Sequence, residues 1–430
     1  MSPFFALLEQ INAVMLSVPV LVTLLGVGVL FTLWSGFSQY RSLTHGVALI
    51  SGRGIDTSKG RGALTHFQAL SAALSGTVGL GNIAGVAIAV EFGGPGAVFW
   101  MWVVGLFGMA LKSAEVTLSM LYRDLSDPED PHGGTMYVCR RGLATLGPNW
   151  ARIGKLAGAF FCVSMLTFAV TGGNMFQAWS VADTTQAYFG VPTWASGLIL
   201  AVLVAVVVLG GVKRLGATAD KLVPFMALLY VIAGAYVLSV QADQLPDVFR
   251  LIFRCAFAPA EALGAFTGAS LGMAFIFGMK RALFSSEAGL GTAPIAHAAV
   301  KTPEPVSEGV VAGLEPFIDT LVVCTVTALV ILTSGVWSRG PAAVWSTPPA
   351  LTQSEPAGWT LSSHELPTQS DTTFKPGEQV FAMLEIDGER KRLYGTVALD
   401  ESGIGIDWQI FHSVSTPVLV ESGVFVDYRG

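Results

Sequence analysis

Long, uncharged apolar runs dominate the pattern of hydrophobic and polar positions along this chain. A helix needs about 20 such residues to cross roughly 30 Å of hydrocarbon. Because hydrocarbon offers no partner to a bare N–H or C=O group, each run is predicted to be helical. The pattern therefore predicts an all-α polytopic membrane protein with eight spans, near residues 14–34, 67–90, 92–111, 156–179, 191–212, 222–242, 262–279 and 320–338.

Composition agrees with a chain whose solvent is mostly lipid. Of its 430 residues, 13% are charged and 52% are hydrophobic, whereas soluble domains carry about 25% charged residues. The alternative, that these runs are buried helices of a large soluble protein, would require an ordinary charged surface elsewhere in the chain, which this composition does not provide. The first run follows no basic region and is too long for a signal-peptide core, so we expect it to be a retained span.

Lysine and arginine are concentrated in alternate connections, the pattern that keeps positive charge in the cytoplasm. Both ends are then expected to be extracytoplasmic, in a plasma (inner) membrane. The chain has no stripe of basic residues with interleaved aromatic residues, so a nucleic-acid-binding protein is not indicated. Arg250 and Arg254 are the exceptions to the alternation. The connections predicted to be cytoplasmic hold Arg41, Arg53, Lys59 and Arg61; Arg123, Arg140, Arg141, Arg152 and Lys155; Lys213, Arg214 and Lys221; and Lys280, Arg281 and Lys301.

The composition changes after a predicted membrane domain of residues 1–338. Residues 339–372 are rich in Pro, Ser and Thr and are predicted to form an extracytoplasmic linker. Residues 373–430 are predicted to be a small β-rich extracytoplasmic unit. A structural cap on the extracellular side is the preferred role for this unit, and a ligand-binding module is the alternative. Its two hairpin patterns are Val380–Ile386 with Leu393–Val397, and Val418–Val420 with Val424–Tyr428.

Glycines crowd the second run, at Gly76, Gly79, Gly81 and Gly85. Each weakens an intact helix by about 1 kcal/mol. A helix broken at the bilayer midplane exposes N–H groups that attract a carboxylate and carbonyl groups that can bind sodium. The alternative is that small residues only allow helices to pack closely.

A second glycine-rich stretch, Leu263–Gly291, carries Lys280, Arg281 and Glu287 near an expected break. Paired interrupted spans are typical of transporters and favour the broken-helix interpretation. These are the second and seventh spans, which fits inverted repeats of five spans. The second repeat would then have only two of its spans, so the chain is expected to be incomplete, with a C-terminal partner chain supplying three.

Polar side chains inside other spans are further candidates. Thr171 to Asn174 and Gln177 lie within about one helical turn, where hydrocarbon penalises them unless they face protein or ligand. Gln177 is predicted to contact substrate, with an interhelical hydrogen bond as the alternative. Lys112 and Glu115 share a helical face and are predicted to form a structural ion pair, with a proton relay as the alternative. Asp319, at the edge of the eighth predicted span, is likewise predicted to have a structural role, with a proton relay as the alternative.

No residue pattern indicates catalysis or a metal centre. His45, His66, His132 and His297 have no metal-ligand spacing, and no nucleophile motif occurs. A membrane enzyme would require a convergent acid/base cluster at one face. The four cysteines lack CxxC spacing and are interpreted as small apolar residues. They are Cys139, Cys162, Cys255 and Cys324.

Several ordered segments resemble the alanine or glycine:cation symporter family. They are Gly79–Ala87, Gly93–Trp102, Gly133–Tyr137, Lys280–Gly289 and Ala293–Ala298. The resemblance covers about residues 14 to 335. It implies a LeuT-like inverted-repeat bundle with an incomplete second repeat, sodium as coupling ion, and a small neutral amino acid bound between the two broken helices.

The resemblance also implies site residues. Carbonyl groups of Gly76, Val78 and Gly79 would bind sodium. The residues expected to bind substrate are Thr77, Gly79, Gly81, Asn82, Gln177, Phe275, Phe277, Gly278 and Met279.

Two residues depart from the family pattern. Leu80 and Ser286 stand where threonine and asparagine are common. The family's last three spans have no counterpart here. The sequence therefore leaves two hypotheses: a symporter working by alternating access, or a split or truncated transporter that is inactive alone.

Overall fold

The computed structural model divides into two compact units, Met1–Trp337 and Ser338–Gly430, each of which is described by itself. Within them the structure describes residues 17–53, 60–127, 131–257, 271–335, 337, 343–345, 351–354, 358–361, 379–386, 389–400, 403–409, 418–421 and 424–427.

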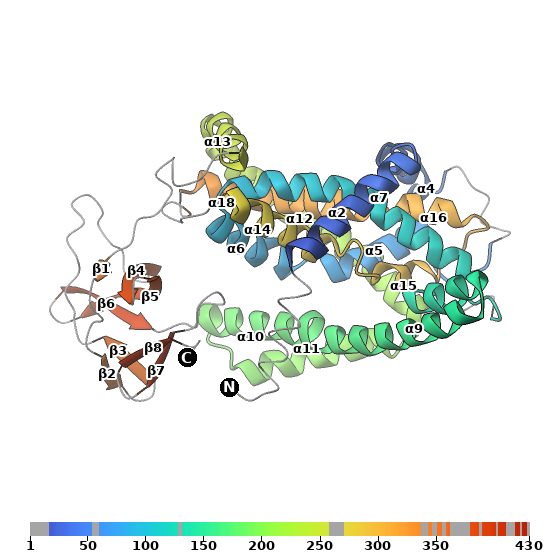
Figure 1. Ribbon diagram of the computed structural model, residues 1–430. Coiled ribbons are helices and arrows are strands. Elements are labelled where there is room, and N and C mark those ends of the chain that lie inside the picture. The colour runs from blue at the N-terminus through green and yellow to red at the C-terminus, as the bar shows by residue number, and fades with distance from the viewer. Residues whose placement is uncertain are drawn as a thin grey trace. The chain divides into compact units, whose positions relative to one another are not determined.

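In its described residues, the first unit is entirely helical (Figure 1). Each of the eight predicted runs overlaps helical structure, but residues 262–270 of the seventh run lie outside the described residues. The elements are α2 (Val18–Trp34), α3 (Ser38–Arg41), η1 (Ser42–Gly46), α4 (Val47–Ile50), α5 (His66–Thr77), η3 (Gly81–Gly85), α6 (Val86–Gly93), α7 (Gly96–Tyr122), α8 (Thr135–Tyr137), η4 (Val138–Gly142), η5 (Leu143–Leu146), α9 (Pro148–Phe168), η6 (Ala169–Met175), α10 (Phe176–Phe189), α11 (Thr193–Val208), α12 (Gly211–Val240), η7 (Ala242–Gln244), α13 (Leu245–Phe257), α14 (Leu271–Ser286), α15 (Ala293–His297), α16 (Pro305–Ala312), α17 (Leu314–Pro316), η9 (Phe317–Val323) and α18 (Cys324–Thr333).

Several of these helices are long and apolar enough to cross a membrane. Among the described residues, four qualify singly: Gly96–Tyr122, Pro148–Gln186, Gly211–Val240 and Pro305–Thr333. Two bent pairs raise the number to six, and α11 is a shorter apolar helix. Large apolar side chains on the outer helices, such as Phe160, Leu166 and Leu209, are exposed. Such faces are suited to lipid, so this is a multi-pass membrane protein.

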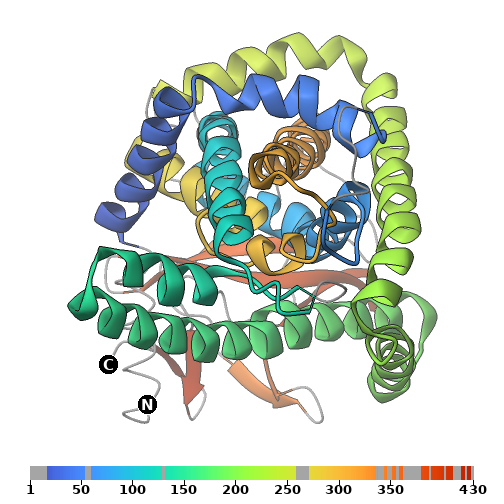
Figure 2. The same ribbon diagram turned by 90° about the vertical axis from the view of Figure 1, so that its right-hand side faces the viewer.

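Two helical stretches, α7 and α16–α18, lie inside the first unit with the other helices around them (Figure 2). Their mutual approach is close: a Cβ added at Gly309 on α16 would come within 2.6 Å of the Ser113 carbonyl oxygen on α7. The main apolar core joins α6, α7, α14 and α18 through buried residues that include Val86, Met101 and Met279.

The second predicted span is broken, as expected. Helix α5 begins with a capping box formed by Thr65 and Gln68, which satisfies two terminal N–H groups. It ends at Thr77, and Val78 is extended, with φ −80° and ψ 105°. Helical structure resumes at Gly81, and the two parts meet at a bend of 57°.

The other expected break differs in position. Helix α14 continues through Lys280 and Arg281 and ends only at Ser286. Glu287, with φ 50°, then takes the left-handed conformation, which is uncommon for a residue with a side chain. The glycine-rich residues before Leu271 lie outside the described residues.

Two connections contain helices that the sequence interpretation did not predict. Residues Ser38–Ile50 are helical and bend by 70° from α2, and α13 occupies the connection after α12. Both are amphipathic or polar in part, so neither forms an uncharged run. A search for long apolar runs therefore misses helices that are short, polar or interrupted by charge.

The described part of the second unit consists of strands. A four-stranded sheet has the order β1-β4-β5-β6, in which β1 pairs parallel with β4 and the other pairs are antiparallel. Two further pairs, β2–β3 and β7–β8, are antiparallel. The strands are β1 (Ala343–Trp345), β2 (Leu351–Ser354), β3 (Gly358–Leu361), β4 (Gln379–Ile386), β5 (Glu389–Asp400), β6 (Gly403–Gln409), β7 (Val418–Glu421) and β8 (Val424–Asp427).

Candidate functional site

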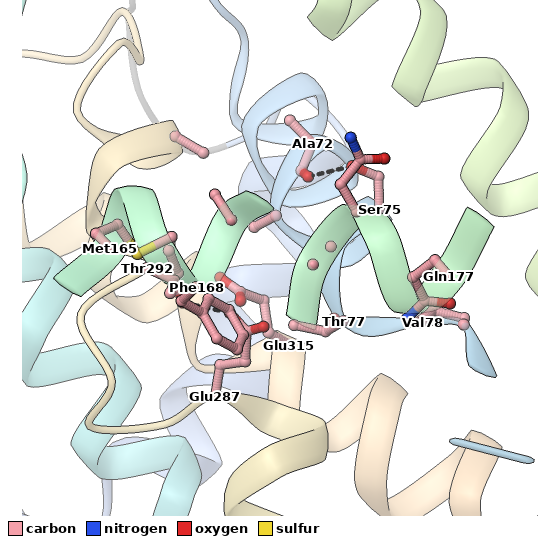
Figure 3. A pocket seen from close by; sticks show the side chains of 18 residues that line it. Ala72, Ser75, Thr77, Val78, Met165, Phe168, Gln177, Glu287, Thr292 and Glu315 are labelled. Atoms are coloured by element: carbon pink, nitrogen blue, oxygen red, sulfur yellow. Dashed lines mark hydrogen bonds between the residues drawn. The ribbon is translucent and has the colours of Figure 1, made fainter. Parts of the chain in front are cut away.

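A cavity of about 530 Å³ lies where the broken span meets the α9–α10 helix (Figure 3). Three parts of the chain line it. They are Ala72, Ala73, Ser75, Gly76, Thr77, Val78 and Gly79 of the break; Met165, Phe168, Ala169, Gly173, Asn174 and Gln177 of the α9–α10 helix; and Glu287, Thr292, Ala293, Ala296 and Glu315. Its size is within the range of small-molecule sites.

The end of α5 forms the first wall. The Ser75 hydroxyl donates to the Ala72 carbonyl oxygen over 2.6 Å. The Gly79 N–H donates to Asn82 Oδ1 over 2.9 Å, which fixes the turn between the two half-helices. A Cβ at Gly79 would lie 3.6 Å from Gln177 Oε1, so the missing side chain brings the Gln177 amide next to the backbone at the break.

A wide helical turn shapes the second wall. Residues Ala169–Met175 form the π-helix η6 between α9 and α10, and π-helical turns often mark functional sites. Gly173, Asn174 and Gln177 face the cavity. Thr171 does not line it, because its hydroxyl donates within the helix to the Thr167 carbonyl oxygen over 2.8 Å.

Acidic side chains form the third wall. In the view of Figure 3, Glu287 and Glu315 lie at the end of the cavity where Phe168 is, and Gln177 lies at the end where Val78 is. Thr292 donates its hydroxyl proton to the Glu287 carboxylate. The cavity is therefore polar at both ends, with negative charge at one of them.

Glu315 belongs to a buried charge cluster. Lys112 Nζ lies 3.3 Å from Glu315 Oε2 and 3.6 Å from Glu115 Oε1, which confirms the ion pair expected between Lys112 and Glu115. Lys112 and Glu315 are both fully buried. A buried lysine requires such partners, since an unpaired charge in a low-dielectric interior is very costly.

The cluster continues away from the cavity through two histidines. His297 Nε2 lies 2.6 Å from Glu315 Oε1, and its Nδ1 is hydrogen-bonded to Glu308. The other Glu308 oxygen is hydrogen-bonded to His66 Nδ1. His297 lies on α15, outside the candidate spans. Burial opposes its charge, but Glu308 and Glu315 outweigh burial and raise the pKa of His297 to about 9.

Asn82 lies behind the break rather than in the cavity. Its Nδ2 donates to Asp319 Oδ1 over 2.5 Å and to Ser285 Oγ over 3.2 Å. Asn82 and Asp319 are both almost fully buried. Asn82 thus holds the two half-helices together on one side and η9 on the other.

The structure brings only part of the predicted site together. Gly76, Thr77, Val78, Gly79 and Gln177 all line the cavity. The other predicted residues do not line it. Gly81 faces the Arg281 guanidinium, Phe275 and Phe277 contact Trp100 and Phe92, Gly278 packs against Ala97 and Trp100, and Met279 lies in the core.

The sequence analysis did not assign Glu315 to the site, nor the two histidines that are linked to it in the charge cluster, His297 and His66. The available signal was the presence of ionisable residues near apolar runs, which is unusual enough to mark function. Spacing alone could not show that His66, His297, Glu308 and Glu315 meet, because they come from separate helices. Within the described residues, no group of three or more His, Cys, Asp or Glu side chains is arranged to hold a metal ion.

Comparison with known proteins gives a consistent family. The model of the sodium:alanine symporter family matches residues 1–359. The sodium/alanine symporter AgcS of Methanococcus maripaludis is 42% identical over 333 residues, which cover 77% of this chain and 71% of that protein. The amino-acid carrier protein AlsT of Bacillus subtilis is 34% identical, covering 74% of this chain and 64% of that protein.

The relatives differ in the substrates that their names give. One described as a probable sodium/glutamine symporter, GlnT of Bacillus subtilis, is 35% identical, with 76% of this chain and 65% of that protein covered. The family model and AgcS indicate a symporter rather than an enzyme, with sodium as the coupling ion. The chain belongs to the sodium:alanine symporter family.

Proposed function

We propose that this chain carries out sodium-coupled symport of a small neutral amino acid, alanine or glycine, by alternating access. The observation that carries the proposal is the cavity at the broken span. It combines the end of one half-helix, the Gln177 amide and two carboxylates in a space of about 530 Å³. This is the arrangement in which discontinuous helices bind substrate and ion together.

The break supplies complementary partners for both ligands. The C-terminal end of α5 carries partial negative charge and peptide carbonyls, so the carbonyls of Gly76, Val78 and Gly79 are assigned to sodium. The N-terminal end of the following half-helix, from Gly81, carries partial positive charge and is assigned to the substrate carboxylate. Thr77 and Gln177 add a hydroxyl and an amide.

The remaining predicted site residues are assigned to a second state. Phe275, Phe277, Gly278 and Met279 lie on α14, which packs on α6 and α7. In a LeuT-like inverted-repeat bundle, α14 would rock together with the broken span against a scaffold. The substrate contacts of these four residues are proposed for that second state. Residues 1–338 would act as the transporter, with both termini outside and the β-rich unit as an extracytoplasmic cap.

The test is uptake of radiolabelled alanine and glycine by proteoliposomes that hold only this chain. Uptake that collapses when choline replaces sodium supports the proposal. Gln177→Ala should raise the half-saturating alanine concentration about tenfold, the effect of losing one or two substrate hydrogen bonds. Gln186→Ala, an exposed position on the same helix, is the matched control.

Two results would contradict the proposal: uptake that ignores sodium, or uptake that is the same in Gln177→Ala, Asn82→Ala and Gln186→Ala. If folded protein binds alanine but does not take it up, the alternative is a partner chain that supplies further spans. Restoration of uptake by such a chain would then replace the single-chain proposal.

A further inference from the structure

The buried chain of carboxylates and imidazoles connects two cavities. The substrate cavity is lined by Glu315. A second cavity, of about 460 Å³, is lined by His66 together with Arg53 and Lys301. Between them, every neighbouring pair along His66, Glu308, His297 and Glu315 is hydrogen-bonded.

The chain is enclosed by protein along its whole length. His66 is 5% exposed, and Glu308, His297 and Glu315 are 0% exposed. Burying four ionisable groups is expensive unless each is paired. A simple ion pair would meet that need with two residues, whereas here the pairs are joined end to end.

Each hydrogen bond along this chain joins an imidazole nitrogen to a carboxylate oxygen, so one partner can donate a proton and the other can accept it. His66 meets Glu308 through Nδ1, and His297 uses both of its ring nitrogens, one toward each glutamate. His66 Nε2 is buried and has no hydrogen-bond partner among the described residues. The end of the chain at the second cavity is therefore free to take up a proton.

We propose that His66, Glu308, His297 and Glu315 form a proton-transfer chain between the second cavity and the substrate cavity. A proton taken up at His66 Nε2 releases the Nδ1 proton to Glu308. Neutral Glu308 no longer stabilises the His297 imidazolium, whose Nε2 proton then passes to Glu315. One proton enters and one appears on Glu315, and only N–H and O–H bonds change.

The surrounding charges favour this direction of travel. Lys112 pairs with both Glu315 and Glu115, so a positive charge lies beside the end of the chain at the substrate cavity. Protonation of Glu315 would free Lys112 to pair more closely with Glu115 or with Glu287, whose backbone carbonyl oxygen lies 3.4 Å from Lys112 Nζ. Arg123, buried at the end of α7, interacts electrostatically with Glu308. The raised pKa of His297 agrees with a proton resting between the two glutamates.

The inference rests on the proposed function only in naming the first cavity as the substrate's. Its test uses proteoliposomes that contain the full chain and a trapped pH-sensitive dye, with the membrane potential clamped by potassium and valinomycin. After external acidification, Glu308→Gln should slow internal acidification about tenfold, at the lower end of what losing a proton-transfer group costs. Glu308 lines neither cavity, and alanine binding by this variant, measured in parallel, shows whether the substrate cavity is still formed.

Matched controls exist for both ends. Glu304→Gln makes the same change at an exposed position on the approach to α16 and should acidify at the unmodified rate. If Glu308→Gln does not fold, His66→Gln removes the entry group and should give the same loss, with exposed His45→Gln as its control.

Acidification at the unmodified rate in both Glu308→Gln and His66→Gln would overturn the inference and leave a structural ion-pair network. Sodium-dependent uptake of radiolabelled alanine, measured on the same vesicles, separates the two proposals. Proton flux without alanine uptake would contradict only the proposed function. Alanine uptake with no effect of the chain variants on proton flux would contradict only the proton-transfer chain.

Discussion

Asn82 Nδ2 donates to Asp319 Oδ1 over 2.5 Å and so ties the break in the second span to η9. Both side chains are almost fully buried. Asn82 Oδ1 accepts the Gly79 N–H at the same time. One amide thereby sets the geometry of the break and its distance from the inner helix.

Asn82→Ala should therefore destabilise the protein as well as reduce uptake. The change leaves the Asp319 carboxylate and the Gly79 N–H without this partner, and each such group costs about 1–3 kcal/mol when buried. We expect a lower melting temperature in detergent and at least about a tenfold loss of sodium-dependent alanine uptake. Thr44→Ala, at an exposed position, is the control. An unchanged melting temperature in Asn82→Ala would show that the bond to Asp319 contributes nothing.

Gly79→Ala should shift selectivity from alanine toward glycine. The added Cβ would lie 3.6 Å from Gln177 Oε1, an ordinary contact that the fold accommodates, but it takes cavity space. One methyl group in a binding site changes discrimination by about 1–3 kcal/mol. Competition between the two labelled substrates measures the ratio. Gly26→Ala, where nothing lies within 4 Å of the new Cβ, should leave it unchanged.

Arg123→Lys should destabilise the end of α7. The Arg123 guanidinium donates to the carbonyl oxygens of Ala298 and Val300 over 2.8 and 2.7 Å, and to those of Arg61 and Thr302 over 3.2 Å. Lysine has three donors without the planar fork and cannot serve four acceptors. We expect a loss on the order of 2 kcal/mol, seen as a lower melting temperature. An equal change in exposed Arg250→Lys would refute this role.

Stability should fall in alkaline solution because of His297. Its pKa rises from 6.5 to about 9 in the folded protein, so its contribution is complete below about pH 6.5 and is lost as the pH rises through 9. The size is on the order of 3 kcal/mol. Melting temperatures measured from pH 6 to 10 should decline in the unmodified chain and in His45→Gln. In His297→Gln the same decline should be weaker, and parallel curves would contradict the assignment.

Four to six helices of the described residues are long and apolar enough to cross a membrane, where eight spans were predicted. Local patterns could predict these because hydrocarbon imposes one requirement on every residue of a span. The break at Gly76 to Gly81 was predictable for a similar reason, since glycine density is a local property. Helix α13 escaped because its charged residues interrupt any long apolar run. The charge network escaped because its members, from His66 to Glu315, lie on different helices, and only tertiary packing brings them together.

The cavity itself could be predicted in part. Gln177 and the residues of the break are polar or small residues inside apolar runs, and this pattern is visible in the local sequence. Which face of α14 meets the cavity depends on the rotation of that helix against α6 and α7. No spacing within residues 275–279 contains that information, and the predicted residues of this segment do not line the cavity.

The π-helical turn of Ala169–Met175 also has a consequence for editing the chain. A π-turn holds one residue more than the α-helical turn it replaces, and one residue advances an α-helix by about 100°. Deleting a single residue from this turn would restore an α-helical turn and leave Gln177 near its present angle, facing Gly79, whereas the same deletion within α9 would rotate the residues that follow by about 100° relative to those before. The π-turn is therefore the part of this wall where the chain can lose one residue without turning the cavity-facing side chains away.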